Sequence, residues 1–140
     1  MKRKATPPYD PLAEGFEDET RTFEEAIFHF LPIENRTRWM RSKRLADLTV
    51  FQAGYFKKAH RHSVERKDLD EGILIYCVDG KGEFSQRGGS WTVSAGDLLY
   101  CYPKTPHSYR ADTKDPWTIH WMHLSGPRMV YYRNLIGFSS

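Results

Sequence analysis

The stretch Gly96-Asp-Leu-Leu-Tyr-Cys-Tyr-Pro-Lys-Thr-Pro-His-Ser-Tyr109 carries the signals from which the fold of this chain is predicted. A turn at Gly96-Asp97 precedes an apolar run that ends at Tyr102, and two prolines then bend the chain. Because side chains along a strand repeat every second residue, His107 and Tyr109 point to the same side of the following strand. We therefore expect a short buried strand, a tight loop and a second strand.

Short runs rich in β-branched and aromatic residues continue this pattern in both directions. Turn residues divide the runs at intervals of about ten residues, the spacing expected of a sandwich or barrel. The expected strands are Leu48–Phe56, His60–Arg66, Gly72–Val78, Gly82–Gln86, Ser90–Val93, Leu98–Tyr102, His107–Ala111 and Trp117–Leu124. Asp79-Gly80 and Gly88-Gly89 are the expected hairpin turns. No long helical period interrupts the strands, so mainly antiparallel pairing is expected.

The two ends of the chain differ from this strand-rich centre. Residues 1–22 are polar and contain several prolines, so a flexible arm is expected there. Between Thr22 and Leu31 a capped helix start and an extended strand remain alternatives. After Pro127 the apolar spacing predicts one helix. The expected organisation is an arm and basic connection over residues 1–47, a barrel over 48–126 and a helix or linker over 127–140.

A basic run surrounds Trp39 and Met40. Its cations are Arg36, Arg38, Arg41, Lys43 and Arg44. Basic side chains around an aromatic ring can contact phosphates or single-stranded bases. Charge runs more often face water, so we favour a solvated connection with Trp39 packed against the barrel.

Composition excludes several classes of protein. A chain of 140 residues suits one domain, and its net charge of +3 neither requires nor excludes a nucleic-acid partner. Cys77 and Cys101 each lie inside an apolar run, which favours reduced, buried thiols. No apolar run is long enough to span a bilayer, and the charged N-terminus does not look like a signal peptide. We therefore expect a cytoplasmic protein without a membrane partner.

Two histidines one residue apart and a third on a later strand form a pattern that divalent metals use. With glycines at 54 and 72, His60, His62 and Glu65 resemble the first motif of the cupins, and His107 belongs to an echo of the second. Only two residues separate His62 from Glu65, so strand parity turns Glu65 away from the histidines. We favour no cofactor, with His62 and His107 as hydrogen-bonded pocket or core residues. The alternative is a metal-dependent cupin enzyme, an isomerase or dioxygenase, with His60, His62, Glu65 and His107 as ligands to a divalent metal.

Six segments, in order and spacing, resemble the N-terminal effector-binding domain of AraC-type transcriptional regulators. They are Gly54–Ala59, His62–Arg66, Ile73–Gly82, Gly96–Leu99, Pro103–Tyr109 and Asp115–Gly126. The resemblance implies a cupin-like double-stranded β-helix, or jelly-roll barrel, with an N-terminal arm and a C-terminal helix. It also implies a homodimer that binds a small-molecule effector, often a sugar, inside the barrel, and the arm as a lid. DNA contact is expected only through a C-terminal domain outside this chain, and no catalysis is required. A plain dimerisation scaffold without a ligand is a further alternative.

The resemblance also implies where the effector binds. Arg66 occupies the position of an arginine that clamps sugar hydroxyls, while Tyr109, Ile119 and Trp121 face the pocket. A buried guanidinium needs a partner, which we expect to be an anionic ligand or a neighbour such as Glu65. The full set of candidate ligand-binding residues is His62, Glu65, Arg66, His107, Tyr109, Ile119, Trp121 and His123.

Overall fold

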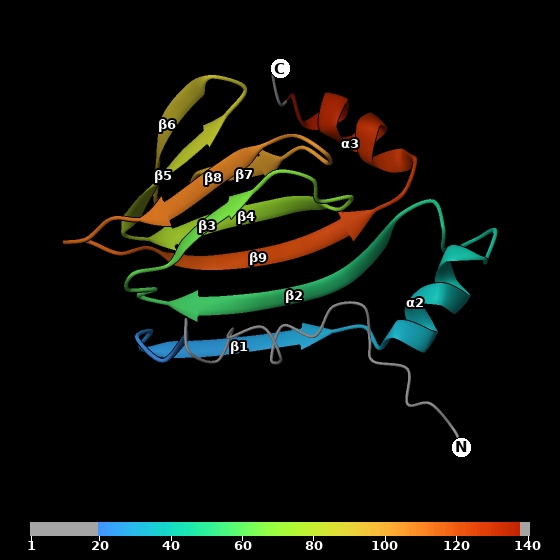
Figure 1. Ribbon diagram of the computed structural model, residues 1–140, viewed down its shortest axis with the longest axis horizontal. Coiled ribbons are helices and arrows are strands. Elements are labelled where there is room, and N and C mark those ends of the chain that lie inside the picture. The colour runs from blue at the N-terminus through green and yellow to red at the C-terminus, as the bar shows by residue number, and fades with distance from the viewer. Residues whose placement is uncertain (1–19, 138–140) are drawn as a thin grey trace.

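The computed structural model describes residues 20–137, which form two antiparallel β-sheets packed face to face (Figure 1). The five-stranded sheet has the order β1 (Glu25–Phe30), β2 (Thr49–Lys57), β9 (Thr118–Ser125), β4 (Gly72–Asp79) and β7 (Leu98–Cys101). The four-stranded sheet has the order β3 (Ser63–Arg66), β8 (His107–Ala111), β5 (Lys81–Gln86) and β6 (Gly89–Ser94). Helix α2 (Ile33–Met40) joins β1 to β2, and α3 (Arg128–Ile136) follows β9. This arrangement confirms the expected jelly-roll barrel with a C-terminal helix.

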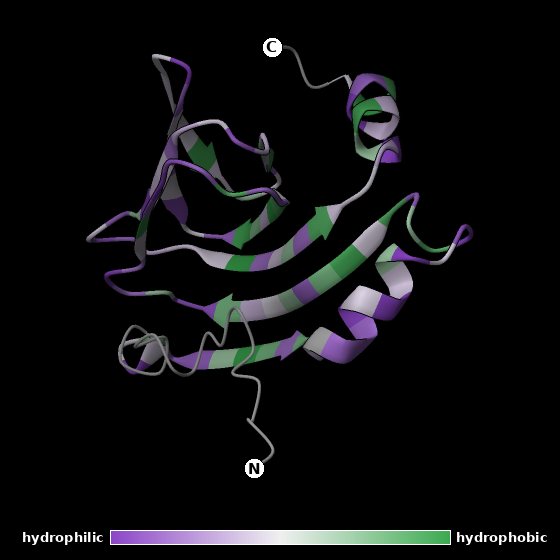
Figure 2. Cartoon of the chain, turned by 45° about the vertical axis from the view of Figure 1, so that its right-hand side comes forward, coloured by the Kyte–Doolittle hydropathy of each residue, from purple (hydrophilic) through white to green (hydrophobic). Residues whose placement is uncertain are grey.

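Alternating side chains along the strands build the core between the two sheets. On β9, Ile119, Trp121 and His123 are buried whereas His120 and Met122 are exposed, as a strand with one buried face requires. Figure 2 shows the resulting alternation of hydrophobic and hydrophilic residues along the strands. The buried faces of both sheets contribute to one apolar cluster, so burial of these faces holds the sandwich together.

The interior is apolar at one end and polar at the other. Near the start of β9, Ala59, Cys77 and Trp117 are completely buried, so this end of the barrel is packed and closed. At the opposite end β3, β5, β7 and β9 finish while β4, β6 and β8 begin, and several polar side chains turn inward there. Both helices lie beside this second end, on the right in Figure 1.

The prediction of a hairpin turn at Asp79-Gly80 is wrong, and the predicted turn at Gly88-Gly89 is shifted by one residue. Gly80 does not connect paired strands, because β4 and β5 belong to different sheets. The turn there carries the chain from one sheet to the other. The β5–β6 hairpin closes with Gln86 opposite Gly89, so its two-residue loop is Arg87-Gly88. Both loop residues have positive φ, 51° and 77°, as a type I′ turn requires.

The expected strand from His60 to Arg66 begins only at Ser63. His60 instead lies in a turn in which the amide of His62 donates to the carbonyl of Ala59 at 3.1 Å, and Arg61 has a φ of 62°. The amide of Ala59 is itself held by the carbonyl of Trp117 at 2.9 Å. The turn therefore separates His60 from His62, and the two imidazoles do not share a strand face.

The open alternatives between Thr22 and Leu31 resolve to a strand. β1 pairs with β2 from Glu25 opposite Lys57 to Phe30 opposite Gln52, and the Thr22 hydroxyl donates to the carbonyl of His60 rather than capping a helix. The segment predicted as arm and basic connection, residues 1–47, thus contains an edge strand of the sheet. Most of the expected flexible arm, residues 1–19, lies outside the described residues.

The basic connection contains a helix that the sequence did not lead us to expect. α2 begins directly after Pro32, carries Glu34 in its first turn, and is mainly hydrophilic in Figure 2. By contrast, α3 confirms the expected C-terminal helix, and Gly137 ends it in the left-handed conformation with a φ of 80°. Among the described residues, no helix has both the length and the apolar character needed to cross a bilayer.

Candidate functional site

Polar side chains from both sheets face each other at one end of the barrel, which we call the polar end. It comprises Gln52, Arg66, Glu71, Gln86, His107 and His123. Across the four-stranded sheet, Arg66 on β3 lies opposite His107 on β8, and His107 lies opposite Gln86 on β5. Across the five-stranded sheet, His123 on β9 lies opposite Gln52 on β2 and Ile73 on β4. Residues at paired positions share a face, so the register gathers the strand residues of this set, and Glu71 directly precedes β4.

Arg66 supplies the positive charge of the polar end. Its guanidinium contributes to lowering the pKa values of His62, His107 and His123, although burial has the larger effect on each. The Nε atom of Arg66 is buried, and Arg66 lies directly opposite buried His107 in the β3–β8 pair, so its side chain turns to the inner face of the sheet. The inward direction of Arg66 agrees with the parity of β3, on which Val64 is also partly buried while Ser63 and Glu65 are exposed.

His107 is a neutral imidazole with a defined tautomer. Its Nδ1 lies 2.9 Å from the carbonyl oxygen of Thr105, which can only accept, so Nδ1 carries the proton. Burial lowers the pKa of His107, opposed in part by the Thr105 hydrogen bond. The side chain is 4% exposed, and its Nε2 makes no hydrogen bond with the described part of the chain. Nε2 therefore presents a lone pair to the interior.

A second group of charged residues connects α2 to the barrel. The Arg36 guanidinium lies 3.1 Å from Oε1 of Glu71, and His123 Nδ1 donates to Oε2 of Glu71 at 2.9 Å. Burial alone would raise the pKa of Glu71, but its hydrogen bond with His123 and the charge of Arg36 hold it below the usual value. Gln52 Nε2 lies 3.0 Å from the same His123 nitrogen. Glu71 is thus an ionised carboxylate held beside neutral His123.

His62 lies deeper in the barrel and is enclosed by aromatic rings. Phe23, Phe56, Tyr109 and Trp117 have ring centroids 5.5–5.9 Å from its own. The indole N–H of Trp117 donates to His62 Nδ1 at 3.2 Å. Burial, with a smaller effect of Arg66, lowers the pKa of His62 to about 4, so it is neutral at pH 7. His62 is a core histidine that accepts the hydrogen bond of the buried Trp117 indole N–H.

The other predicted site residues fall into two groups. Tyr109, Ile119 and Trp121 are buried members of the core cluster and face the interior. The Glu65 side chain is 73% exposed and lies 4.0 Å from Lys67. Glu65 therefore faces away from the other candidates, as strand parity predicted, and it does not provide the inward neighbour considered for Arg66.

The alternative metal ligands do not converge. His60 and Glu65 are exposed, whereas His62 and His107 are buried, and His62 Nδ1 already accepts the Trp117 proton. Among residues 20–137, no group of three or more His, Cys, Asp or Glu side chains is placed to hold a metal ion. The four residues therefore do not fit a divalent metal in this arrangement.

A cavity of about 640 Å³ opens at the polar end of the four-stranded sheet. Its lining comes from the end of β3, the β5–β6 hairpin and the loop before β8, and includes Arg66, Gln86 and His107. Lys67 and Arg87 add positive charge, and Glu65 is its single acidic lining residue. The volume is in the range of small-molecule sites.

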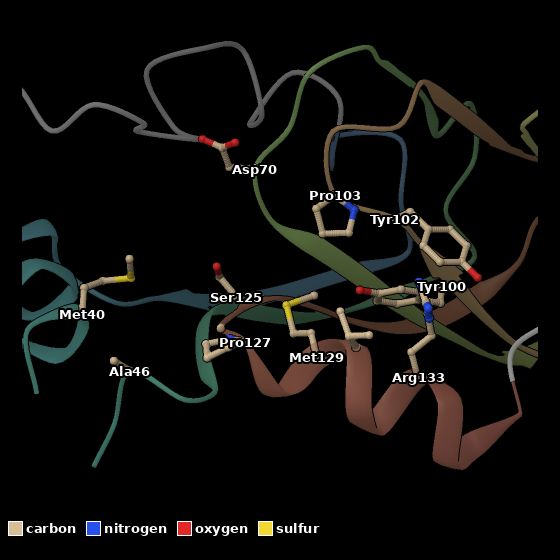
Figure 3. Close-up of a pocket in the computed structure, with 12 residues that line it drawn as sticks. Met40, Ala46, Asp70, Tyr100, Tyr102, Pro103, Ser125, Pro127, Met129 and Arg133 are labelled. Atoms are coloured by element: carbon tan, nitrogen blue, oxygen red, sulfur yellow. The ribbon is translucent and has the colours of Figure 1, made fainter. Parts of the chain in front are cut away.

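A second cavity, of about 510 Å³, lies outside the barrel against α3 (Figure 3). Met129 packs there with Tyr100, Tyr102 and Leu124 in a small apolar cluster. The guanidinium carbons of Arg87 and Arg133 lie 4.4 and 5.1 Å from the ring centroid of Tyr102. Because the amide of Tyr102 also donates to Gln86 Oε1 at 2.9 Å, this residue connects the polar end to α3.

Sequence reasoning did not identify Arg36, Gln52, Glu71 and Gln86 as part of the site. Arg36 was considered only as one cation of a solvated run. The available signal for Glu71 was an acidic residue directly before a buried strand, but nothing local indicated its partners. These residues come together through the register of distant strands.

The fold and its polar end define a class: a cupin-like barrel whose residues 20–137 place an arginine, and no cluster of metal ligands, at the polar end. The model of the AraC-like ligand binding domain family matches residues 50–139, and the chain belongs to this family.

Two curated relatives support this assignment. The MmsAB operon regulatory protein of Pseudomonas aeruginosa is 36% identical over 96 residues, which cover 66% of this chain and 31% of the relative. The lactose operon transcription activator of Staphylococcus xylosus is 22% identical over 90 residues, which cover 64% of this chain and 32% of the relative. The matched region is thus about a third of the length of each relative.

Solved structures show the same fold at low sequence identity. YhaK from Escherichia coli has a TM-score of 0.57 at 16% identity, covering 74% of this chain and 46% of the other. The cupin domain of Cnp3 from Schizosaccharomyces pombe has a TM-score of 0.50 at 9% identity, covering 82% and 76%. These similarities concern the fold alone.

Proposed function

We propose that this chain is the effector-sensing and dimerisation domain of an AraC-type transcriptional regulator. In this proposal a small polar metabolite, such as a sugar or a related hydroxylated compound, binds at the polar end of the barrel. The observation that carries it is Arg66, which is half-buried directly opposite buried His107 and lines a cavity with it, in a chain of the AraC-like ligand binding family. Two relatives that are named as operon regulators support the regulatory role.

Effector binding would be transmitted through α3. Tyr102 connects Gln86 at the polar end to Arg133 on α3, so a ligand that moves the β5–β6 hairpin also changes the support of this helix. A ligand shifts such an equilibrium only by its difference in affinity for the two arrangements. DNA contact belongs to a domain outside this chain, and the regulator acts in the cytoplasm.

The proposed dimer uses the outer surface of α3. Tyr131, Leu135 and Ile136 are 60%, 68% and 56% exposed, an apolar surface that a second copy would cover. The same helix receives the contact from Tyr102. Dimer geometry and effector binding would then be coupled through one element.

Arg66→Ala tests the proposed site. A true effector should raise the melting temperature of the wild-type chain in a dose-dependent way, by stabilising only the folded state. Arg66→Ala should abolish this shift while the circular dichroism spectrum of the folded barrel is kept. Arg110→Ala is the matched control, because Arg110 is an exposed arginine that pairs with Glu83 on the outer surface. Unchanged effector affinity in Arg66→Ala would contradict the clamp role.

The geometry does not favour the alternative of a metal-dependent cupin enzyme, because two of its four proposed ligands are exposed and two are buried. Loss of an activity together with bound metal in both His62→Ala and His107→Ala would revive it. Metal-free protein that still binds an effector would support the sensory role.

A further inference from the structure

His107 defines what kind of group an effector must bring. Its Nδ1 donates to Thr105, so Nε2 is a pure acceptor and cannot donate while the ring is neutral. Nε2 is buried and has no hydrogen-bond partner among residues 20–137. A buried acceptor without a partner costs about 1–3 kcal/mol, and a ligand O–H or N–H would remove that cost.

Arg66 defines the charge of the effector. It is directly opposite His107 in the β3–β8 pair, where His107 is buried and Arg66 half-buried, and both line the cavity at the polar end. A guanidinium binds a carboxylate with two parallel hydrogen bonds, which a sugar hydroxyl cannot match in energy. An anionic group is therefore the stronger partner for this side of the site.

The charges around the cavity also favour an anionic ligand. The cavity at the polar end is lined by Arg66, Lys67 and Arg87 against Glu65, which already lies 4.0 Å from Lys67. Glu71, the carboxylate inside the polar end, is engaged by Arg36 and His123. Clefts with an excess of one sign of charge attract ligands of the opposite sign.

We propose that the effector is a small 2- or 3-hydroxycarboxylic acid, whose carboxylate binds Arg66 and whose hydroxyl donates to Nε2 of His107. Directly opposite residues have Cβ atoms about 4.5–5.5 Å apart, and both side chains line the same cavity, so one small ligand can contact both. Acids with the carboxylate and the hydroxyl on the same carbon or on neighbouring carbons are the smallest ligands that carry both groups. This inference rests on the proposed effector function and narrows its ligand class.

Calorimetric titration of the 140-residue chain with matched probes tests the proposal. The probes are lactate and 3-hydroxybutyrate, butyrate without the hydroxyl, butane-1,3-diol without the carboxylate, and arabinose as a neutral sugar. We expect at least one hydroxy acid to bind tenfold or more tightly than butyrate and the diol. Butyrate binding as tightly as 3-hydroxybutyrate would overturn the role of His107.

Variants assign the two contacts. Arg66→Met should remove the preference for acids over the diol, and His107→Phe should reduce hydroxy-acid affinity to that of butyrate. Arg110→Met, which removes an exposed guanidinium from β8, should change neither the preference for acids nor the hydroxy-acid affinity. Nitrogen-15 NMR of the wild-type imidazoles provides a test without substitution. The Nε2 resonance of His107 should shift with the hydroxy acid and not with butyrate.

The outcomes separate this inference from the function on which it rests. Binding of arabinose or of other neutral metabolites, without binding of any acid, would overturn the hydroxy-acid proposal and leave the effector function standing. No response to the acids or to a broad panel of neutral metabolites would contradict both.

Discussion

Two of the three histidines of the predicted site show how the same residue type serves two purposes in one barrel. His62 and His107 are both neutral and buried, but His62 accepts at Nδ1 from Trp117 whereas His107 donates at Nδ1 to Thr105. The hydrogen bond of one ring nitrogen decides what the other can offer. His62 is thereby committed to the core, while His107 keeps an acceptor for a ligand.

The lowered pKa of His62 should make the stability of the fold depend on pH. Its pKa is lowered from 6.5 to about 4 in the folded chain, so below pH 6.5 the unfolded state binds the proton more readily. The free energy of unfolding should therefore fall by about 2–3 kcal/mol from this residue as the pH drops from 7 towards 4. Urea unfolding across this range measures the slope.

Two glutamine substitutions provide the comparison. His62→Gln should give a shallower pH dependence, because the residue no longer titrates and its amide oxygen can still accept from Trp117. His60→Gln, at an exposed position, should leave the slope as in the wild type. An identical slope in His62→Gln would show that this imidazole does not titrate differently in the two states.

Gly54 allows Trp121 to lie across the five-stranded sheet. A Cβ at this position would come within 2.5 Å of the Trp121 ring and 2.8 Å of the Ile27 carbonyl oxygen. Gly54→Ala should therefore lower the free energy of unfolding by about 1–3 kcal/mol. Combined with Trp121→Phe, which removes the crowded ring atoms, the loss should be smaller than the sum of the single changes. Strict additivity in chemical unfolding would mean that the two residues are not in contact.

At the scale of elements, α2 depends on one charged contact more than on its own sequence. The helix has eight residues, too few to be stable alone, and no side chain caps its start. Arg36 reaches Glu71 and also lies 4.2 Å from the centroid of the Phe51 ring. Tertiary contacts of this residue therefore hold α2 beside the polar end.

Arg36→Met should lower the free energy of unfolding by about 1–3 kcal/mol, because Glu71 keeps its buried charge but loses a cationic partner. Amide exchange in α2 should also become faster. Arg38→Met is the matched control on the same helix, since Arg38 is exposed. Equal effects of the two substitutions would show that the contact with Glu71 contributes nothing to stability.

At the scale of the whole molecule, apolar residues remain exposed on α3 and on the outer face of the five-stranded sheet. Besides the residues of α3, Tyr76, Leu98 and Met122 lie exposed on strands of the five-stranded sheet. Such a surface is unusual for a protein that acts as a monomer. The part of it on α3 is the surface for which we propose a second copy.

Leu135→Glu should weaken self-association at least tenfold, because a charged carboxylate would be buried in the proposed interface. Sedimentation velocity over a range of protein concentrations measures the change. Thr92→Glu introduces the same charge at an exposed position of β6, in the other sheet, and should leave the association constant unaltered. A wild-type chain that stays monomeric at high concentration would contradict the dimer.

Most of the strands were predictable because the information that defines them is local. His107–Ala111 was predicted with its observed bounds, and β2, β4, β7 and β9 differ from prediction by about one residue at their ends. The turn at His60 was not predicted, because it depends on the contact of Ala59 with Trp117, which is 58 residues further along the chain. α2 was missed because its hydrophilic sequence has no apolar period.

The candidate site was predictable only in part, for the same reason. Parity placed Tyr109 with His107 and Trp121 with His123 on shared faces, which are buried, and turned Glu65 away, as observed. The family resemblance, not parity, assigned Arg66 to the pocket. Parity did not show that His62 is enclosed by rings, since a strand pattern does not reveal which side chains lie above it. Nor did it connect Arg36 to Glu71, whose contact spans two elements.

The sequence by itself determined the jelly-roll class, the family resemblance and the inward or outward direction of most strand residues, because alternation and turn spacing act over a few residues. Only the tertiary structure decided which polar groups meet. Strand register between distant segments placed Arg66 opposite His107, and the hydrogen bond to Thr105 fixed which nitrogen of that imidazole faces the interior. The chemistry of the site depends on those contacts, which no local pattern contains.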